Sequence, residues 1–226
     1  MTTAIPVIVP VKALHDAKQR LSPVLSAEDR RRLVLAMLAD VLSTLSDVET
    51  VSRVLVVTPD QEVAALASAD GVSVLSESYS GGLNAAVQRG LQHPDVRRVG
   101  KALIVPGDVP LATAEEIATL IAAGIRRDHP RVTIVPSRDG GGTNALLLSP
   151  LDVIEPEFGP DSFVKHLAAA VARRVDAEVM QLPGLARDID LPDDLMELQR
   201  RRSGSSRYAF LRSIPKLDET RMGNLP

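Results

Sequence analysis

The chain has 226 residues, of which 45% are apolar and 24% are charged, and its formal net charge is −3. This size and composition are typical of one globular domain with a modest extension, and they exclude collagen-like and wholly disordered proteins. The absence of cysteine excludes disulfide frameworks, thiolate nucleophiles and cysteine-ligated metals, and 2% aromatic residues without a basic excess argue against binding to nucleic acid.

Apolar runs and helical periodicity alternate through the first half of the chain. A strand is predicted at 5–12, and a helix is predicted at 27–45 after the capping residue Ser26. Two further strands, at 53–58 and 72–75, flank a helical stretch of alanine and leucine. The first half therefore indicates two β-α-β units.

The second half continues this alternation, with one exception. The predicted helices are 81–91, 114–125, 161–173 and 191–202, and the predicted strands are 101–105, 132–135, 145–148 and 178–182. Asp139-Gly140 lies between two of these strands and is typical of a hairpin, which predicts an antiparallel insertion.

Strands and helices in this order predict an α/β fold with a mainly parallel sheet covered on both faces. The regular elements end near Arg202, so we predict one domain at 1–202 and a C-terminal extension at 203–226 that is an arm or partly mobile. This extension could contribute to a homodimer. No signal peptide or membrane-length apolar run is found, which predicts a cytoplasmic protein with no membrane partner.

Ligands of such sheets bind at the carboxyl ends of the strands, and the first loop at that edge carries three cations. In a chain of negative net charge, Lys12, Lys18 and Arg20 favour an anion such as a triphosphate. The alternative is that they are ordinary solvated loop charges. A dinucleotide-binding glycine fingerprint and a P-loop are both missing, which argues against dehydrogenases and P-loop NTPases.

A second candidate for nucleotide binding is Gly81-Gly82-Leu83-Asn84 at the start of a helix. Backbone N–H groups and the Asn84 amide could contact a base edge or a phosphate there. The alternative is a turn followed by a helix cap.

Three aspartates are candidate metal ligands. Asp108 follows an apolar strand in a turn restrained by two prolines and a glycine, and Asp188 and Asp190 would point the same way from an extended segment. Carboxylate oxygens suit Mg²⁺. The alternative for Asp188 and Asp190 is that their charges stabilise the dipole of the following helix.

A second anion pocket is predicted from two polar segments. Gly140-Gly141-Gly142-Thr143-Asn144 allows close backbone approach to a ligand, and Ser162 lies at the start of a helix, where a phosphate or carboxylate would suit. Asp161 or Ser162 could instead only cap that helix. His166, one turn further on, is interpreted as a half-buried ring rather than a ligand contact.

Taken in order, these segments resemble one known family, the CofC/FbiD guanylyltransferases. The segments are Pro10-Val11-Lys12 with Lys18-x-Arg20-Leu21, Gly82-Leu83-Asn84, Gly107-Asp108-x-Pro110, Gly142 to Leu146, Phe158 to His166, and Asp188-x-Asp190. The resemblance runs from about residue 5 to 202. It implies a three-layer nucleotidyltransferase fold of the nucleotide-diphospho-sugar transferase type.

The resemblance also implies a reaction. Enzymes of this family transfer GMP from GTP to 2-phospho-L-lactate, phosphoenolpyruvate or 3-phospho-D-glycerate and release pyrophosphate, in coenzyme F-420 biosynthesis. The main departure is Gly141, which bears on the choice of the acceptor acid rather than on the reaction.

The family's functional residues carry over position by position. By resemblance, the phosphorylated acid is held by Thr143, Gly159 and Ser162; Mg²⁺ by Asp108, Asp188 and Asp190; and GTP by Lys12, Lys18, Arg20 and Asn84. Lys18, Arg20 and Asp108 are the residues expected to act in catalysis, where the two cations would take up charge on the leaving pyrophosphate.

Two other readings remain open from the residues. Asp188-Ile189-Asp190 resembles the metal-binding Asp-x-Asp of sugar-nucleotide glycosyltransferases, which would release a nucleoside diphosphate instead of pyrophosphate. A catalytically silent nucleotide-binding module that retains the fold is the second alternative.

Overall fold

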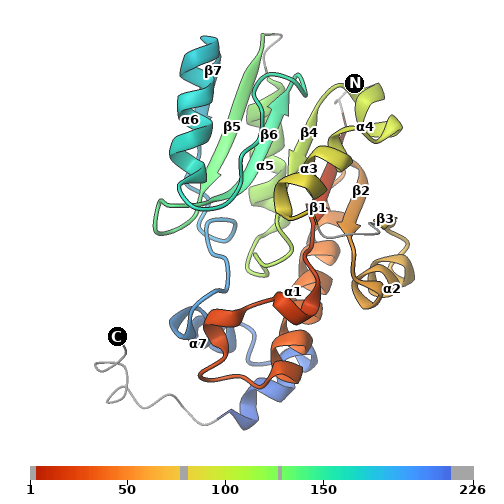
Figure 1. Ribbon diagram of the computed structural model, residues 1–226, viewed down its shortest axis with the longest axis vertical. Coiled ribbons are helices and arrows are strands. Elements are labelled where there is room, and N and C mark those ends of the chain that lie inside the picture. The colour runs from red at the N-terminus through yellow and green to blue at the C-terminus, as the bar shows by residue number, and fades with distance from the viewer. Residues whose placement is uncertain (1–3, 77–80, 127–128, 215–226) are drawn as a thin grey trace.

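The computed structural model describes residues 4–76, 81–126 and 129–214, and its centre is a seven-stranded sheet in the order β3-β2-β1-β4-β6-β5-β7 (Figure 1). The strands are β1 (Ile5–Pro10), β2 (Val51–Thr58), β3 (Ser73–Ser76), β4 (Ala102–Ile104), β5 (Arg131–Pro136), β6 (Thr143–Ser149) and β7 (Asp176–Val179). Of these seven strands, only β6 runs against its neighbours, pairing antiparallel with β4 and β5. The predicted mainly parallel sheet with an antiparallel insertion is confirmed.

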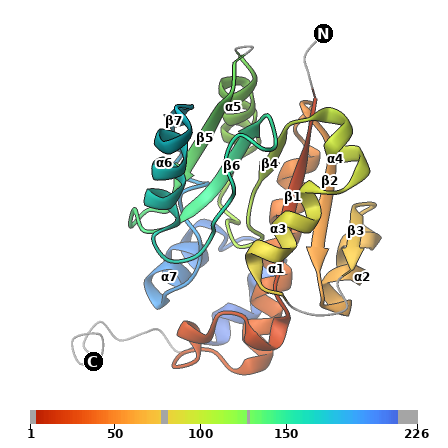
Figure 2. The ribbon, with the colours of Figure 1, turned by 45° about the horizontal axis from the view of Figure 1, so that its top comes forward.

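Helices cover both faces of this sheet (Figures 1 and 2). One layer contains α1 (Ala27–Ser46), α2 (Gln61–Ala69), α5 (Ala114–Ile125) and α7 (Pro192–Arg201), and the other contains α3 (Leu83–Leu91), α4 (Pro94–Val99) and α6 (Ser162–Arg173). Alternate residues of β1 point to opposite layers: Val7 and Val9 join the first core and Ile8 joins the second. No helix in the described ranges is long and apolar enough to cross a membrane.

Most element bounds lie within about two residues of the predicted ones, but β7, predicted at 178–182, is displaced to Asp176–Val179, and one short helix was not predicted. The sequence analysis did not predict α4, which begins with Pro94 at its first turn and ends at Gly100 in the left-handed conformation, with φ of 76°. These are ordinary start and stop signals. They were not recognised because six residues are too few to establish a helical period.

The C-terminal extension packs against the domain as far as the structure describes it. Its short helix η3 (Ser206–Ser213) lies beside α1, and its residues Tyr208 and Leu211 join the α1 core. The Tyr208 hydroxyl donates to Asp40 Oδ2 at 2.9 Å, and Arg207 Nη1 donates to Asp40 Oδ1 at 2.5 Å. The rest of the extension, 215–226, lies outside the described residues, and the predicted domain division stays a prediction.

We expect Tyr208→Phe to destabilise the protein by about 1.5–3 kcal/mol, because the buried Asp40 carboxylate loses a hydrogen-bond donor. Chemical denaturation measures this change. Ser213→Ala is the matched control, since it removes an exposed hydrogen bond to Phe210 in the same element and should change stability by less than about 0.5 kcal/mol. Equal stability of Tyr208→Phe and the parent protein would contradict a stabilising role of the hydrogen bond from Tyr208 to Asp40.

Candidate active site

One buried lysine joins two loops at the carboxyl edge of the sheet. Lys18 follows β1, and its Nζ lies 2.5 Å from Asp108 Oδ2 and 2.6 Å from Asp190 Oδ1. Its side chain is only 7% exposed. Burial by itself lowers the lysine pKa, but the two carboxylates outweigh it, so the pKa is raised and Lys18 stays protonated. Three predicted site residues are thus in direct contact.

The backbone of Lys18 shows how this contact is made. Lys18 has φ of 52° and ψ of 41°, a left-handed conformation that is uncommon for a residue with a side chain. It lies between two short helices, η1 (Leu14–Asp16) and η2 (Gln19–Leu21), of which Leu14 and Leu21 are buried. Packing of the loop therefore holds a backbone conformation that the residue alone would rarely adopt.

Asp194, which the sequence analysis did not select, holds Asp190 in place. Its Oδ2 accepts hydrogen bonds from the Asp190 N–H at 3.3 Å and the Leu191 N–H at 2.9 Å. Arg138 Nη2 donates to Asp194 Oδ1 at 2.9 Å and compensates the buried charge. The position of Asp194 at the third residue of a helix is the signal that could have indicated its capping role.

The third predicted aspartate, Asp188, is held differently. Asn144 Nδ2 donates to Asp188 Oδ1 at 3.1 Å, so an amide from β6 orients the carboxylate. Burial raises the pKa of Asp188, and the charges of Asp108 and Asp190 raise it further, against the effect of the Asn144 hydrogen bond. The three aspartates are close enough to influence one another.

The donor set suits one oxygen-liganded cation. Asp108 and Asp190 already direct carboxylate oxygens at a single positive charge, and Mg²⁺ is usually held by one or two carboxylates together with substrate phosphates. Within the described ranges, no group of three histidine or acidic side chains is arranged to hold a metal. The predicted three-ligand set with Asp188 is therefore not preassembled, and it stays a prediction.

A cavity of about 310 Å³ opens beside Lys18. Its walls include the predicted site residues Lys12, Lys18, Arg20, Asp108 and Asp190. Leu83, at the start of α3, lies on the same wall. The structure thus brings the cationic loop and two of the aspartates around one space, where a polyphosphate would meet both positive side chains and carboxylates.

Asn84, next to Leu83 in α3, binds the backbone of the loop before Gly159. Its Nδ2 donates to the Phe158 carbonyl at 3.0 Å, and its Oδ1 accepts from the Phe158 N–H at 2.7 Å. One N–H and one lone pair of the amide remain for other partners. Its predicted contact with GTP stays a prediction, and the structure adds a link between α3 and the loop before Gly159.

The residues predicted to hold the acid surround the start of α6. Thr143 begins β6 and is buried, with Oγ1 3.0 Å from His166 Nδ1. Ser162 is the first residue of α6, and its N–H donates to the Gly159 carbonyl at 3.1 Å. Gly159 has φ of 121°, which a residue with a side chain rarely adopts. The helix N-terminus favours an anion at this position.

His166 is buried to 0% exposure, not half-buried as predicted. Its Nε2 accepts a hydrogen bond from the Glu157 N–H at 2.9 Å. Burial lowers the pKa of His166 to about 4, so the ring is neutral at physiological pH.

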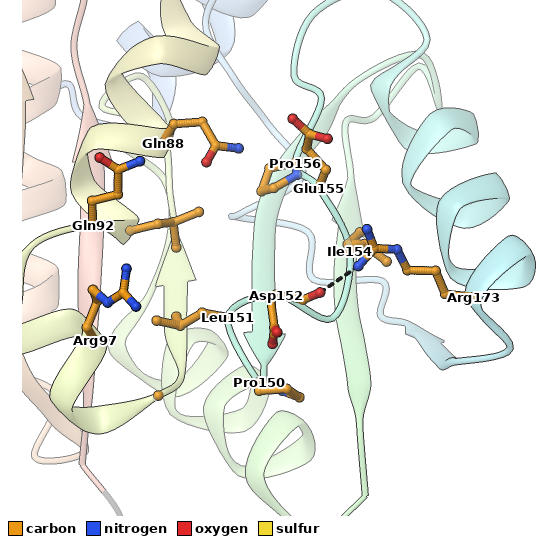
Figure 3. Close-up of a pocket in the computed structure, with 12 residues that line it drawn as sticks. Gln88, Gln92, Arg97, Pro150, Leu151, Asp152, Ile154, Glu155, Pro156 and Arg173 are labelled. Atoms are coloured by element: carbon orange, nitrogen blue, oxygen red, sulfur yellow. Dashed lines mark hydrogen bonds between the residues drawn. The ribbon is translucent and has the colours of Figure 1, made fainter.

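A larger cavity, of about 530 Å³, lies away from these residues (Figure 3). Gln88, Gln92 and Arg97 from α3 and α4 face Asp152, Glu155 and Arg173 across it. It lies at the far end of β6, next to Pro150, and contains no predicted site residue.

Comparison with known proteins agrees with the sequence resemblance. The family model described as guanylyl transferase CofC like matches residues 5–221. A phosphoenolpyruvate guanylyltransferase of Roseiflexus sp. (strain RS-1) is 43% identical over 91% of this chain and 89% of its own length. A 2-phospho-L-lactate guanylyltransferase of Methanothermobacter thermautotrophicus is 34% identical over 92% of this chain and 89% of its own length.

Solved structures of similar fold confirm the predicted fold type. A protein described as a nucleotide-diphospho-sugar transferase from Desulfovibrio desulfuricans G20 matches with a TM-score of 0.72 and 17% identity, over 93% of this chain and 94% of its own. A nucleotidyl transferase from Methanothermobacter thermautotrophicus matches with a TM-score of 0.65 and 17% identity, over 88% of this chain and 97% of its own.

We expect Asp188→Asn to stabilise the metal-free protein at neutral pH. Because the folded-state pKa of Asp188 is raised, its ionised form costs stability above that pKa, and the neutral amide removes the cost. A rise of a few degrees in Tm corresponds to about 1 kcal/mol in a domain of this length. The gain should shrink as the pH falls through the Asp188 titration, because the parent carboxyl then becomes neutral too.

Thermal unfolding in EDTA at several pH values measures this effect. Asp193→Asn, which changes an exposed carboxylate in the first turn of α7, is the matched control and should lower Tm slightly, because it removes a charge that stabilises the helix dipole. A lower Tm for Asp188→Asn than for the parent protein at neutral pH would contradict the expectation.

Proposed function

Because the chain belongs to the CofC-like guanylyltransferase family, we propose that it transfers GMP from GTP to the phosphate of a phosphorylated three-carbon acid and releases pyrophosphate. Phosphoenolpyruvate is the first candidate acceptor, since the relative of that name shares 43% identity, and 2-phospho-L-lactate and 3-phospho-D-glycerate are the others. The product would enter coenzyme F-420 biosynthesis. The observation that carries the proposal is the contact of Lys18 with Asp108 and Asp190 beside a cavity that Lys12 and Arg20 also line.

The proposed reaction is a single in-line displacement. An oxygen of the acceptor phosphate forms a bond to the α-phosphorus of GTP, and the bond to the oxygen that bridges the α- and β-phosphorus breaks. The acceptor phosphate is already ionised at neutral pH, so no general base is required. This agrees with a site in which the one buried histidine of the acceptor region is neutral and hydrogen-bonded on both ring nitrogens.

The cationic loop would hold the triphosphate. Lys12, Lys18 and Arg20 line the cavity, where they would bind phosphate oxygens and stabilise the charge that develops on pyrophosphate as it leaves. The N–H and the oxygen lone pair of the Asn84 amide that are not bonded to Phe158 would contact the nucleotide from the start of α3. The preference for guanine over other bases is carried over from the family.

We place Mg²⁺ at Asp108 and Asp190, with Asp188 as the third ligand. When bound, the ion would supply charge neutralisation between the two anionic substrates. Asn144 and Asp194 would orient the carboxylates for this purpose. Asn144 donates a hydrogen bond to the Asp188 carboxylate, and Asp194 accepts one from the Asp190 N–H. Ligand orientation by such neighbours is general in metal sites.

The acceptor acid would bind at the start of α6. The Thr143 hydroxyl, the Ser162 hydroxyl and the backbone at Gly159 would hold its phosphate or carboxylate, aided by the helix dipole.

We propose that the enzyme acts in the cytoplasm, where GTP and phosphorylated acids occur. We also propose that it forms a homodimer, and light scattering would measure the mass of the assembly in solution.

The direct test is pyrophosphate release from GTP and Mg²⁺ with each acid supplied separately. We expect release with at least one of the three acids and none with GTP alone. Release of GDP in place of pyrophosphate would instead indicate glycosyl transfer. Folded protein that binds GTP but reacts with none of the acids would overturn the proposed reaction.

We expect Asp108→Asn to lower kcat about 100–1,000-fold, the size of effect seen when one electrostatic stabiliser is removed from an active site. The fold should remain intact, because Asp108 is partly exposed and the amide still accepts a hydrogen bond from Lys18. Steady-state pyrophosphate release, with circular dichroism to check folding, measures the change. Asp193→Asn is the matched control, and full turnover in Asp108→Asn would overturn the metal assignment.

A further inference from the structure

We propose that His166 is a positioning residue that directs the Thr143 hydroxyl proton toward the acceptor acid. This inference rests on the proposed function, since it takes Thr143 as part of the acceptor pocket. His166 itself does not touch the acid in this proposal: it acts through Thr143. The tautomer of the His166 ring decides which way the Thr143 hydroxyl points.

The hydrogen bonds of His166 identify that tautomer. The Glu157 backbone N–H can only donate, and it lies 2.9 Å from Nε2, so Nε2 must offer a lone pair. A neutral imidazole carries its one proton on the other nitrogen. Nδ1 therefore donates to Thr143 Oγ1, from which it is 3.0 Å away. The lowered pKa of His166, about 4, agrees with a neutral ring.

The tautomer decides what Thr143 can do. Because Oγ1 accepts the Nδ1 proton, its own proton is free to be donated elsewhere. Within the described residues, the Thr143 hydroxyl has no second hydrogen-bond partner. A buried hydroxyl in this state offers a donor to an anion, which is the group that phosphoenolpyruvate and the other two acids present. An Nε2-protonated ring would instead accept the hydroxyl proton and turn the oxygen lone pairs toward the acid.

His166 is itself anchored by the loop before Gly159. Through Nε2 it fixes the Glu157 backbone, and its ring meets that of Phe158 edge-on, with centroids 5.2 Å apart. Asn84 fixes the Phe158 backbone from the other side. The ring therefore connects β6, which carries Thr143, to the loop that leads to Gly159 and Ser162, and this loop fixes the orientation and tautomer of the ring.

Two substitutions separate the contacts of the two nitrogens. In His166→Asn the amide can replace Nδ1 as the donor to Thr143, but it is too short to reach Glu157. In His166→Gln the amide oxygen can replace Nε2 as the acceptor for Glu157, but the donor to Thr143 is lost. We expect KM for the acceptor acid to rise about 10-fold in His166→Gln, the size that one lost hydrogen bond produces, and markedly less in His166→Asn. KM for GTP should stay within about twofold in both.

Thr143→Val completes a double-mutant cycle. If His166 acts through Thr143, the double variant Thr143→Val with His166→Gln should lose no more acceptor affinity than Thr143→Val alone. The proposal is overturned if the KM increases of the two single variants multiply in the double variant. It is also overturned if His166→Asn and His166→Gln have equal KM values for the acid. These outcomes are measured against active parent enzyme, so they are distinct from failure of the proposed function, in which the parent releases no pyrophosphate.

The tautomer can also be read in the parent protein without any substitution. Nitrogen-15 spectra of the histidine-labelled protein, assigned with His166→Gln or His166→Asn, should show a protonated Nδ1 and an unprotonated Nε2. A protonated Nε2 would overturn the proposal even if neither variant could be assayed.

Discussion

The candidate site depends on one buried cation between two carboxylates. Lys18 comes from the loop after β1, Asp108 from the loop after β4, and Asp190 from the segment before α7, and these residues are 90 and 172 positions from Lys18. A lysine ammonium that is 7% exposed is stable only when its charge is compensated. The same contact therefore satisfies Lys18 and brings together the two loops that the proposed reaction needs.

The single reversed strand makes the second half of the site possible. Because β6 runs antiparallel to β4 and β5, its first residue, Thr143, lies at the edge of the sheet where β1 and β4 end. A parallel strand in this position would present its last residue there. The reversal thus sets Asn144 beside Asp188, to which it donates a hydrogen bond, and Thr143 beside His166 of α6.

The site shows features that favour function over stability. Asp188 is a carboxylate whose pKa is raised by burial and by two neighbouring negative charges, and Lys18 is held in a left-handed backbone conformation. The buried charge of Asp188 and the backbone conformation of Lys18 each lower the stability of the folded protein. The two apolar cores, one on each face of the sheet, compensate this loss. Asp40, in contrast, is buried with its partners Arg207 and Tyr208 and holds the C-terminal segment to α1.

The sequence by itself determined the α/β class, the approximate bounds of most strands and helices, and the antiparallel hairpin, and it supplied the candidate site residues. Periodicity, capping and motif order are local properties of the chain. Only the tertiary structure decided which of these residues touch. The contacts of Lys18 with Asp190, of Asn84 with Phe158 and of His166 with Thr143 join distant segments, and they depend on strand order and register. The roles of Asp194 and Asn144 and the full burial of His166 follow from packing, which no local pattern in the sequence specifies.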